Sequence, residues 1–201
     1  MNRSKVPSQA VEKRASICQL NALAKEIPQV LAIFMSDETE KAGEMANVLF
    51  QDVFECQKRL NAEDCQFWRR VYVRTVFASI EGLMSFLKLV ATEEEVTASQ
   101  SSKLRSKENI EFAYREFARR IDSTFVLDKN GKHWKALCSS LKVRNRLTHP
   151  KKLCELNVTE PELAAVKEVY SWICGTSFFE LLNKSRKLDN AAQSKIIFSN
   201  V

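Results

Sequence analysis

Apolar residues recur at helical spacing along most of the chain. Residues 9–35 follow this pattern but contain Pro28, which predicts a bend or a break in the helix. A second helix is predicted to begin at Asp37, which precedes Glu40 by three residues in a capping-box-like pair. Its inward face is predicted to consist of Ala42, Met45, Leu49, Val53 and Cys56.

Residues 67–91 are apolar on nearly every side, as expected of a helix at the centre of a bundle. Within it, residues 71–91 come closest to a membrane segment, but Arg74, Glu81 and Lys88 interrupt them, and such charges would be costly in lipid. The segment is therefore interpreted as the central helix of a soluble protein and not as a membrane span.

The second half of the chain alternates polar breaks with further helices. Residues 92–109 lack periodicity and are predicted to form a long mobile loop. A fourth helix is predicted to point Ile110, Ala113, Phe117, Ile121 and Phe125 inward. A fifth helix is predicted from about Lys132 to Leu147, and a sixth near Thr159, which has capping-box spacing to Glu162.

These patterns predict an all-α fold. Only 4 glycines and 4 prolines are present, which leaves few residues for the many turns of a β fold. Residues 61–201 are predicted to form a helical bundle with a four-helix core, and residues 1–60 an N-terminal helical extension that packs on it.

Charge and motif content narrow the function classes. The net charge of +6 favours an anionic partner. No glycine-rich phosphate loop, pair of catalytic carboxylates or metal-ligand spacing is evident, so no cofactor and no metal are predicted. The N-terminus has basic residues but no apolar signal region, which predicts a cytoplasmic protein without membrane contact.

Candidate chemistry gathers at the end of the fifth helix, in the stretch VRNRLTHPKK, residues 143–152. At 100° per residue, Asn145 is predicted to point into the bundle, with Arg144 at the edge of the buried face. That face is predicted to contain Trp134, Leu137, Cys138 and Leu141. Pro150 disfavours helical geometry at the residue before it and places His149 just past the helix end.

Two segments resemble the HEPN superfamily, and most closely its plasmid- and phage-borne members. RNRLTH, residues 144–149, is similar to the R-x4-6-H motif, and RTVFASIEGLMSFLK, residues 74–88, is similar to the Arg- and Glu-bearing helix of many members. The resemblance spans roughly residues 65–184. It implies a four-helix bundle core, homodimers and, where Arg and His are both present, metal-independent RNA cleavage. Many members are inactive and serve as interaction or nucleotide-binding modules.

The residue types suit RNA cleavage through the 2′-hydroxyl. His149 has a side chain that moves protons near neutral pH, and the Arg144 fork suits a phosphorane. Asn145 would orient a reacting group, and Glu81 and Arg74 are expected behind these residues as orienting or structural partners. Glu81 is also predicted to be largely buried and bonded to a basic group of another helix, preferably Arg144, because an ionised carboxylate amid apolar surface is tolerated only when it is paired. Phosphate contacts are expected from Lys142, Arg146 and Lys151.

A single subunit offers too few histidines for an acid and a base. The other histidine, His133, lies about 24 Å away at the opposite end of the same helix, at 1.5 Å per residue. A two-fold dimer that brings both copies of His149 to one cleft would supply the missing group, so a homodimer is expected.

Three function classes stay open. The first is a metal-independent endoribonuclease of toxin or defence type that cleaves single-stranded RNA and has a possible protein antitoxin. The second is a silent module that binds RNA or nucleotides. The third is a structural dimer whose extension recruits another protein. In the last two classes Arg144 and His149 only form a basic helix terminus that interacts favourably with the helix dipole.

Overall fold

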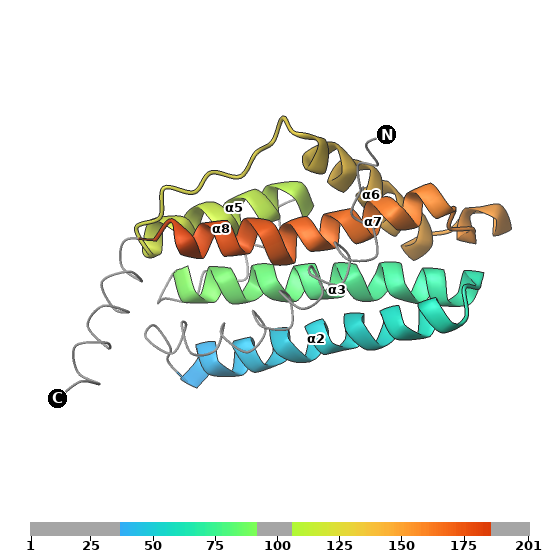
Figure 1. Ribbon diagram of the computed structural model, residues 1–201, viewed down its shortest axis with the longest axis horizontal. Helices are drawn as coiled ribbons and strands as arrows, with labels where there is room; N and C mark the ends of the chain where they lie inside the picture. The colour runs from blue at the N-terminus through green and yellow to red at the C-terminus, as the bar shows by residue number, and fades with distance from the viewer. Residues whose placement is uncertain (1–36, 92–105, 186–201) are drawn as a thin grey trace, which may run out of the picture. The chain divides into compact units, whose positions relative to one another are not determined.

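The computed structural model describes residues 37–91 and 106–185 (Figure 1). The chain divides into two compact units, Met1–Met35 and Ser36–Val201, and every described residue belongs to the second. The elements are α2 (Asp37–Ala62), α3 (Gln66–Ala91), α5 (Ser106–Arg120), α6 (Lys132–Thr148), the 3₁₀ helix η2 (Leu153–Leu156), α7 (Glu160–Ser171), the π-helix η3 (Trp172–Ser177) and α8 (Phe178–Asn183). Across these two ranges there is no β-strand, only an isolated bridge between Ser123 and Ser185. The predicted all-α class is confirmed for this part of the chain.

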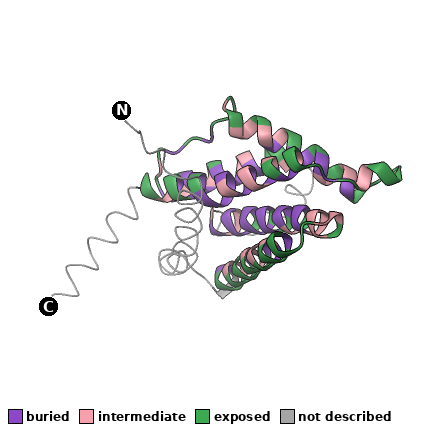
Figure 2. Cartoon of the chain, turned by 45° about the vertical axis from the view of Figure 1, so that its right-hand side comes forward, coloured by how far each residue is buried: buried purple, intermediate pink, exposed green. Residues whose placement is uncertain are grey.

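Helix α3 is the central element, as predicted. It packs against α2, α5, α6 and α7, and α7 continues through η3 into α8 without a break. The residues of α3 are mostly buried or partly buried (Figure 2). One side of it nevertheless carries exposed residues between positions 67 and 85, with the partly buried Val71 among them, and this surface, the α3 strip, consists of Phe67, Arg74, Ala78, Glu81 and Ser85. The apolar pattern concealed this open side because the polar residues on it are few and widely spaced.

Helix α2 packs along α3, and its buried face is narrower than predicted. Val53 and Cys56 are buried, but Met45 is 53% exposed while its neighbour Ala46 is buried. One residue turns a helix by about 100°, and a helix with one main neighbour buries only a narrow stripe. Residues 1–36 lie outside the described residues, so an extension that ends near residue 60 stays a prediction.

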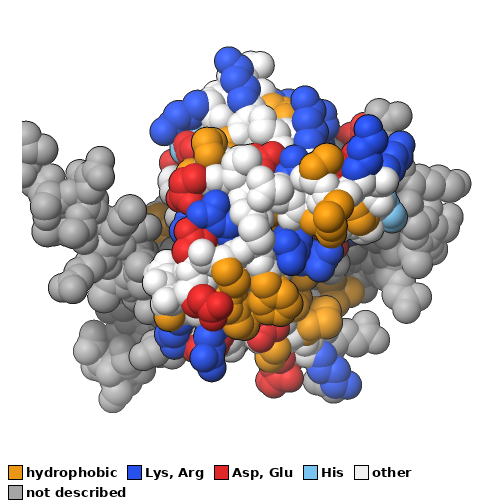
Figure 3. Space-filling model, turned by 90° about the vertical axis from the view of Figure 1, so that its right-hand side faces the viewer, with side chains coloured by type: hydrophobic (Ala, Val, Ile, Leu, Met, Phe, Trp, Pro, Cys, Tyr) orange, Lys and Arg blue, Asp and Glu red, His pale blue; other side chains and the backbone are white. Residues whose placement is uncertain are grey.

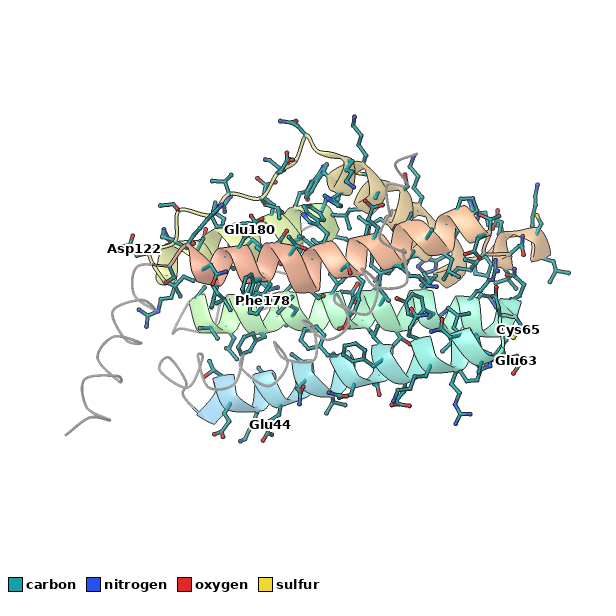
Figure 4. The ribbon with its side chains drawn as sticks, viewed as in Figure 1. Glu44, Glu63, Cys65, Asp122, Phe178 and Glu180 are labelled. Atoms are coloured by element: carbon teal, nitrogen blue, oxygen red, sulfur yellow. The ribbon has the colours of Figure 1, made fainter. Side chains whose placement is uncertain are left out.

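Helix α5 begins earlier and ends earlier than predicted. Residues 106–109, predicted to be loop, belong to the helix, and residues 92–105 lie outside the described ranges. The helix ends at Arg120 because Asp122 adopts a left-handed φ of 52°. Asp122 is labelled in Figure 4, just beyond this end of the helix. The amide of Ser123 then donates to the carbonyl of Ala118 at 2.8 Å, a Schellman-type termination. Ile121 and Phe125 are buried as predicted, but beyond the helix.

The connection from α6 to α7 is fastened to the first turn of α3. The Gln66 side chain donates to the carbonyl of Val158 at 3.1 Å and accepts from its amide at 2.8 Å. Arg69 donates to the same carbonyl at 3.1 Å and to Glu160 at 2.9 Å. The predicted capping box of Thr159 and Glu162 is present at the start of α7. These bonds hold the last residues of the connection and the start of α7 in place relative to α3.

None of the described helices combines the length and the hydropathy that crossing a membrane would require.

Candidate functional site

Arg144 faces α3 and forms an ion pair with Glu81. Its Nη2 lies 2.5 Å from Oε1 of Glu81, and the two side chains are 29% and 52% exposed. The predicted pairing of Glu81 with Arg144 is therefore confirmed, whereas the predicted burial of Glu81 is wrong. Glu81 belongs to the α3 strip, where neighbouring helices leave the carboxylate half open to solvent.

Arg74 binds the end of α6 instead of Glu81. Its Nη2 donates to the carbonyl of Leu147 at 2.9 Å. This carbonyl belongs to the last turn of α6, where helix carbonyls lack intrahelical partners and a cation is favourable. Arg74 and Glu81 thus each bind α6 from α3.

Asn145 does not point into the bundle, so this prediction is wrong. The residue is exposed, and its Oδ1 accepts a hydrogen bond from Nη1 of Arg144 at 3.3 Å. The buried face of α6 is turned by about 100° from the predicted one. It consists of Leu137, Ser140, Leu141, Val143 and Leu147. The small polar residue Ser140 is fully buried, whereas the large apolar Trp134 is only partly buried. A pattern that assigns apolar residues to the inside and polar residues to the outside predicts the opposite for both.

His149 caps the end of α6, where the prediction placed it. Its amide donates to the carbonyl of Asn145 at 3.0 Å, and its backbone leaves helical geometry with φ −130° and ψ 61°. The residue is exposed, and its imidazole makes no hydrogen bond or ion pair within residues 37–91 and 106–185. Both ring nitrogens are therefore available to a ligand or a partner.

The three residues predicted to contact RNA have different surroundings. Lys142 and Lys151 are exposed, and neither ammonium group has an ion-pair partner among the described residues. Arg146 is only 30% exposed and binds both the carbonyl of Asn157 at 2.8 Å and Glu162 at 3.1 Å. Arg146 therefore joins α6 to the start of α7.

Glu162 shows the electrostatic effect of this junction. Burial disfavours its charge, but bonds from Thr159 and Arg146 outweigh burial and lower the pKa of the Glu162 carboxyl below its ordinary value.

The end of the described helices that carries η2 and the α2–α3 turn faces the viewer in Figure 3. Lysine and arginine side chains are frequent there and alternate with carboxylates and exposed apolar groups.

The other histidine, His133, lies at the start of α6, far along the helix from His149. Its ring stacks on Trp172 at 5.6 Å between centroids, and Nδ1 lies 3.1 Å from Oε1 of Glu168. The structure does not bring the two histidines of one subunit together. Within the described ranges no three His, Cys, Asp or Glu residues are grouped so that they could hold a metal ion.

Sequence reasoning missed a groove between α6 and α7. Ser139 and Ser140 from α6 line it together with Lys142 and Arg146, and Pro161 and Glu162 line it from α7. The hydrophobic periodicity could not indicate this groove, because it assigns polar residues to the exposed side of a helix, whereas Ser140 is fully buried.

Comparisons of this chain with protein-family models, with curated proteins and with solved structures found no match.

Proposed function

We propose that this protein is a metal-independent endoribonuclease that cleaves single-stranded RNA, in keeping with a toxin or defence role. The observation that carries the proposal is the arrangement at the end of α6. Arg144 is held by Glu81 and Asn145 one turn before the exposed His149, whose imidazole is unbonded within the described ranges. The proposed site thus combines an oriented cation with a free proton carrier.

In the proposed reaction His149 removes the proton of a ribose 2′-hydroxyl. The 2′-oxygen forms a bond to the adjacent phosphorus, and the bond from phosphorus to the 5′-oxygen breaks. The leaving oxygen takes a proton from a second acid, which gives a 2′,3′-cyclic phosphate and a 5′-hydroxyl. Arg144 uses N–H donors that Glu81 and Asn145 do not occupy to hold the non-bridging oxygens as their charge grows.

The second acid is proposed to be His149 of a second copy. The α3 strip supports this homodimer because it is exposed directly beside Arg144 and has small residues, Ala78 and Ser85, that allow close approach. His133 of the same chain is unsuitable because it lies about 24 Å along the helix, at 1.5 Å per residue. A two-fold contact along the strip would bring two equivalent sites near one axis.

A second candidate is a silent module that binds RNA or nucleotides or forms homodimers. One observation favours it: Arg144 is already neutralised by Glu81, as in a purely structural ion pair. Such a module would bind RNA through the same basic surface without cleaving it.

The deciding experiment incubates the purified full chain with mixed single-stranded RNAs in EDTA. Parent protein should leave fragments with cyclic phosphate and 5′-hydroxyl ends. His149→Ala and Arg144→Ala should each lower the rate by about 10² to 10⁴-fold, the usual contribution of general acid–base or oxyanion groups. His133→Ala is the matched control and should retain the parent rate.

Two results would reject the nuclease mechanism. One is activity that disappears in EDTA, and the other is activity that survives His149→Ala in a folded protein, as judged by circular dichroism. Binding of RNA without cleavage by the parent would favour the silent module.

A further inference from the structure

The groove between α6 and α7, here called the α6/α7 groove, has features of a binding site that the proposed reaction does not use. Its volume is about 490 Å³. Its lining residues are Ser139, Ser140, Lys142, Val143, Arg146, Pro161, Glu162 and Ala165. Val143, Pro161 and Ala165 give it apolar walls between the polar groups.

Two polar atoms of this lining are buried without a partner in the described structure. They are Oγ of Ser140, whose residue is 0% exposed, and Nε of Arg146. Buried donors are nearly always bonded, to protein, to water or to a ligand, so this pair marks a place where an acceptor would be favourable. The Arg146 Nε–H can only donate and the Ser140 hydroxyl can donate, so an oxygen with lone pairs, such as that of a phosphate, is an acceptor that suits both.

The charges of the groove specify the acceptor further. Lys142 has no ion-pair partner among the described residues, and Arg146 shares Glu162 with the capping box. Two cations and one carboxylate leave one net positive charge. A phosphodiester carries one negative charge and has two non-bridging oxygens, so it matches both the charge and the donors.

The groove also runs along the part of α6 that ends at His149. Ser139, Lys142 and Arg146 follow one another at three and four residues along the helix, and His149 comes three residues later. At 1.5 Å per residue, Lys142 lies about 10 Å and Arg146 about 4.5 Å before His149 along the axis. A strand whose scissile phosphate sits at His149 would reach this groove with a neighbouring phosphate.

We propose that the α6/α7 groove binds one phosphodiester of the RNA strand on one side of the scissile linkage. This inference rests on the proposed function for the strand's position at His149. It assigns to Lys142, Ser139 and Ser140 a binding role separate from the chemistry, and it gives Arg146 a second role beside its bond to Glu162.

The test measures binding of 2′-O-methyl RNA, which lacks the attacking hydroxyl and stays intact. A series of short oligonucleotides carries one neutral methylphosphonate at each linkage in turn. Lys142→Ala should weaken binding of the fully charged strand about 5- to 10-fold and reduce the salt slope by about 0.7, the value for one phosphate contact on a single strand. This loss should disappear when one particular linkage is neutral. Lys142→Arg should restore binding.

Lys135→Ala is the matched control because Lys135 is an exposed lysine of α6 outside the groove. It should show no dependence on the position of the neutral linkage. Equal losses from Lys142→Ala at every linkage, or no RNA binding at all, would overturn the inference. If the parent cleaves RNA but the effect of Lys142→Ala does not depend on which linkage is neutral, the groove proposal is rejected and the nuclease proposal stands. If that effect depends on one linkage but the parent cleaves no RNA, the nuclease proposal is rejected and the groove proposal stands.

Discussion

At the scale of single residues, Glu81 matters more for the orientation of Arg144 than for the stability of the bundle. The carboxylate is 52% exposed, and ion pairs of this kind contribute about 0 to 1 kcal/mol because water screens them. Orientation is a different quantity. An Arg side chain has many rotamers, and Glu81 together with Asn145 selects the one that lies against α3.

Glu81→Gln should therefore separate activity from stability. We expect the free energy of unfolding to change by less than about 1 kcal/mol. The cleavage rate should fall about 10-fold, with KM nearly constant and the shape of the pH profile preserved, because Gln still accepts one hydrogen bond but no longer holds the cation. Kinetics with a defined RNA and urea unfolding measure the two effects.

Glu180→Gln is the control for this change. Glu180 forms a comparable exposed pair with Lys184 at 3.7 Å and lies on α8, so its loss should leave cleavage unchanged. If Glu81→Gln cleaved RNA at the full parent rate, Glu81 would not be needed to position Arg144.

At the scale of elements, α6 is fastened at its end by groups from two other helices. Arg74 of α3 binds the Leu147 carbonyl, and Arg146 bonds to Glu162 of α7. Loops at helix ends usually vary in position, but this one is tied by polar bonds to the start of α3. His149 follows directly from this turn, and the proposed cleavage would need such a fixed position for a residue that meets a phosphate.

Glu162→Gln should destabilise the fold in a manner that depends on pH. The folded-state pKa of Glu162 is lowered, so its charge stabilises the protein above the ordinary carboxyl pKa of 4.5. That contribution is lost as the pH falls from 4.5 through the folded value. At pH 7 the variant should be about 1 kcal/mol less stable, since a charge-assisted bond is lost while Gln can keep the capping bond.

Urea unfolding of parent and variant at pH 7 and in the acid range measures this difference, which should shrink below pH 4.5. Thr159→Ala is the comparison, because it removes the other half of the capping box and should keep part of its loss in acid. If Glu162→Gln lowered the free energy of unfolding by the same amount at pH 7 and in acid, the stabilisation would not come from the charge of Glu162.

At the scale of the whole molecule, the open side of α3 is the main feature without a partner among the described residues. A central helix normally buries all its sides, yet the α3 strip carries exposed residues between Phe67 and Ser85. The strip includes Glu81 and therefore borders the proposed site. A second copy placed there would cover it and bring two His149 side chains toward one cleft.

Ala78→Arg should test this arrangement by placing a long charged side chain in the middle of the strip. The parent should sediment as a dimer at micromolar concentration, and the variant should be a monomer that has lost cleavage. Ala164→Arg, at an exposed position of α7 outside the strip, should remain a dimer with parent activity. A parent that is monomeric, or an Ala78→Arg dimer with full activity, would exclude the strip as the interface.

The sequence alone determined the features that depend on near neighbours in the chain. The limits of α6, the capping box of Thr159 and Glu162, and the position of His149 before Pro150 all follow from interactions within a few residues. The pairing of Glu81 with Arg144 was also predicted, although the burial on which that prediction rested is absent, since Glu81 is 52% exposed.

Only the tertiary structure decided which side of each helix is buried. Periodicity gives a face to within about one residue, or 100°, and that margin separates an inward Asn145 from an outward one and a buried Met45 from an exposed one. The fully buried Ser140, the captured Arg146 and the groove between them depend on α7, which lies far along the chain. Burial is a property of neighbours in space, and a local pattern cannot specify neighbours that the fold brings from elsewhere.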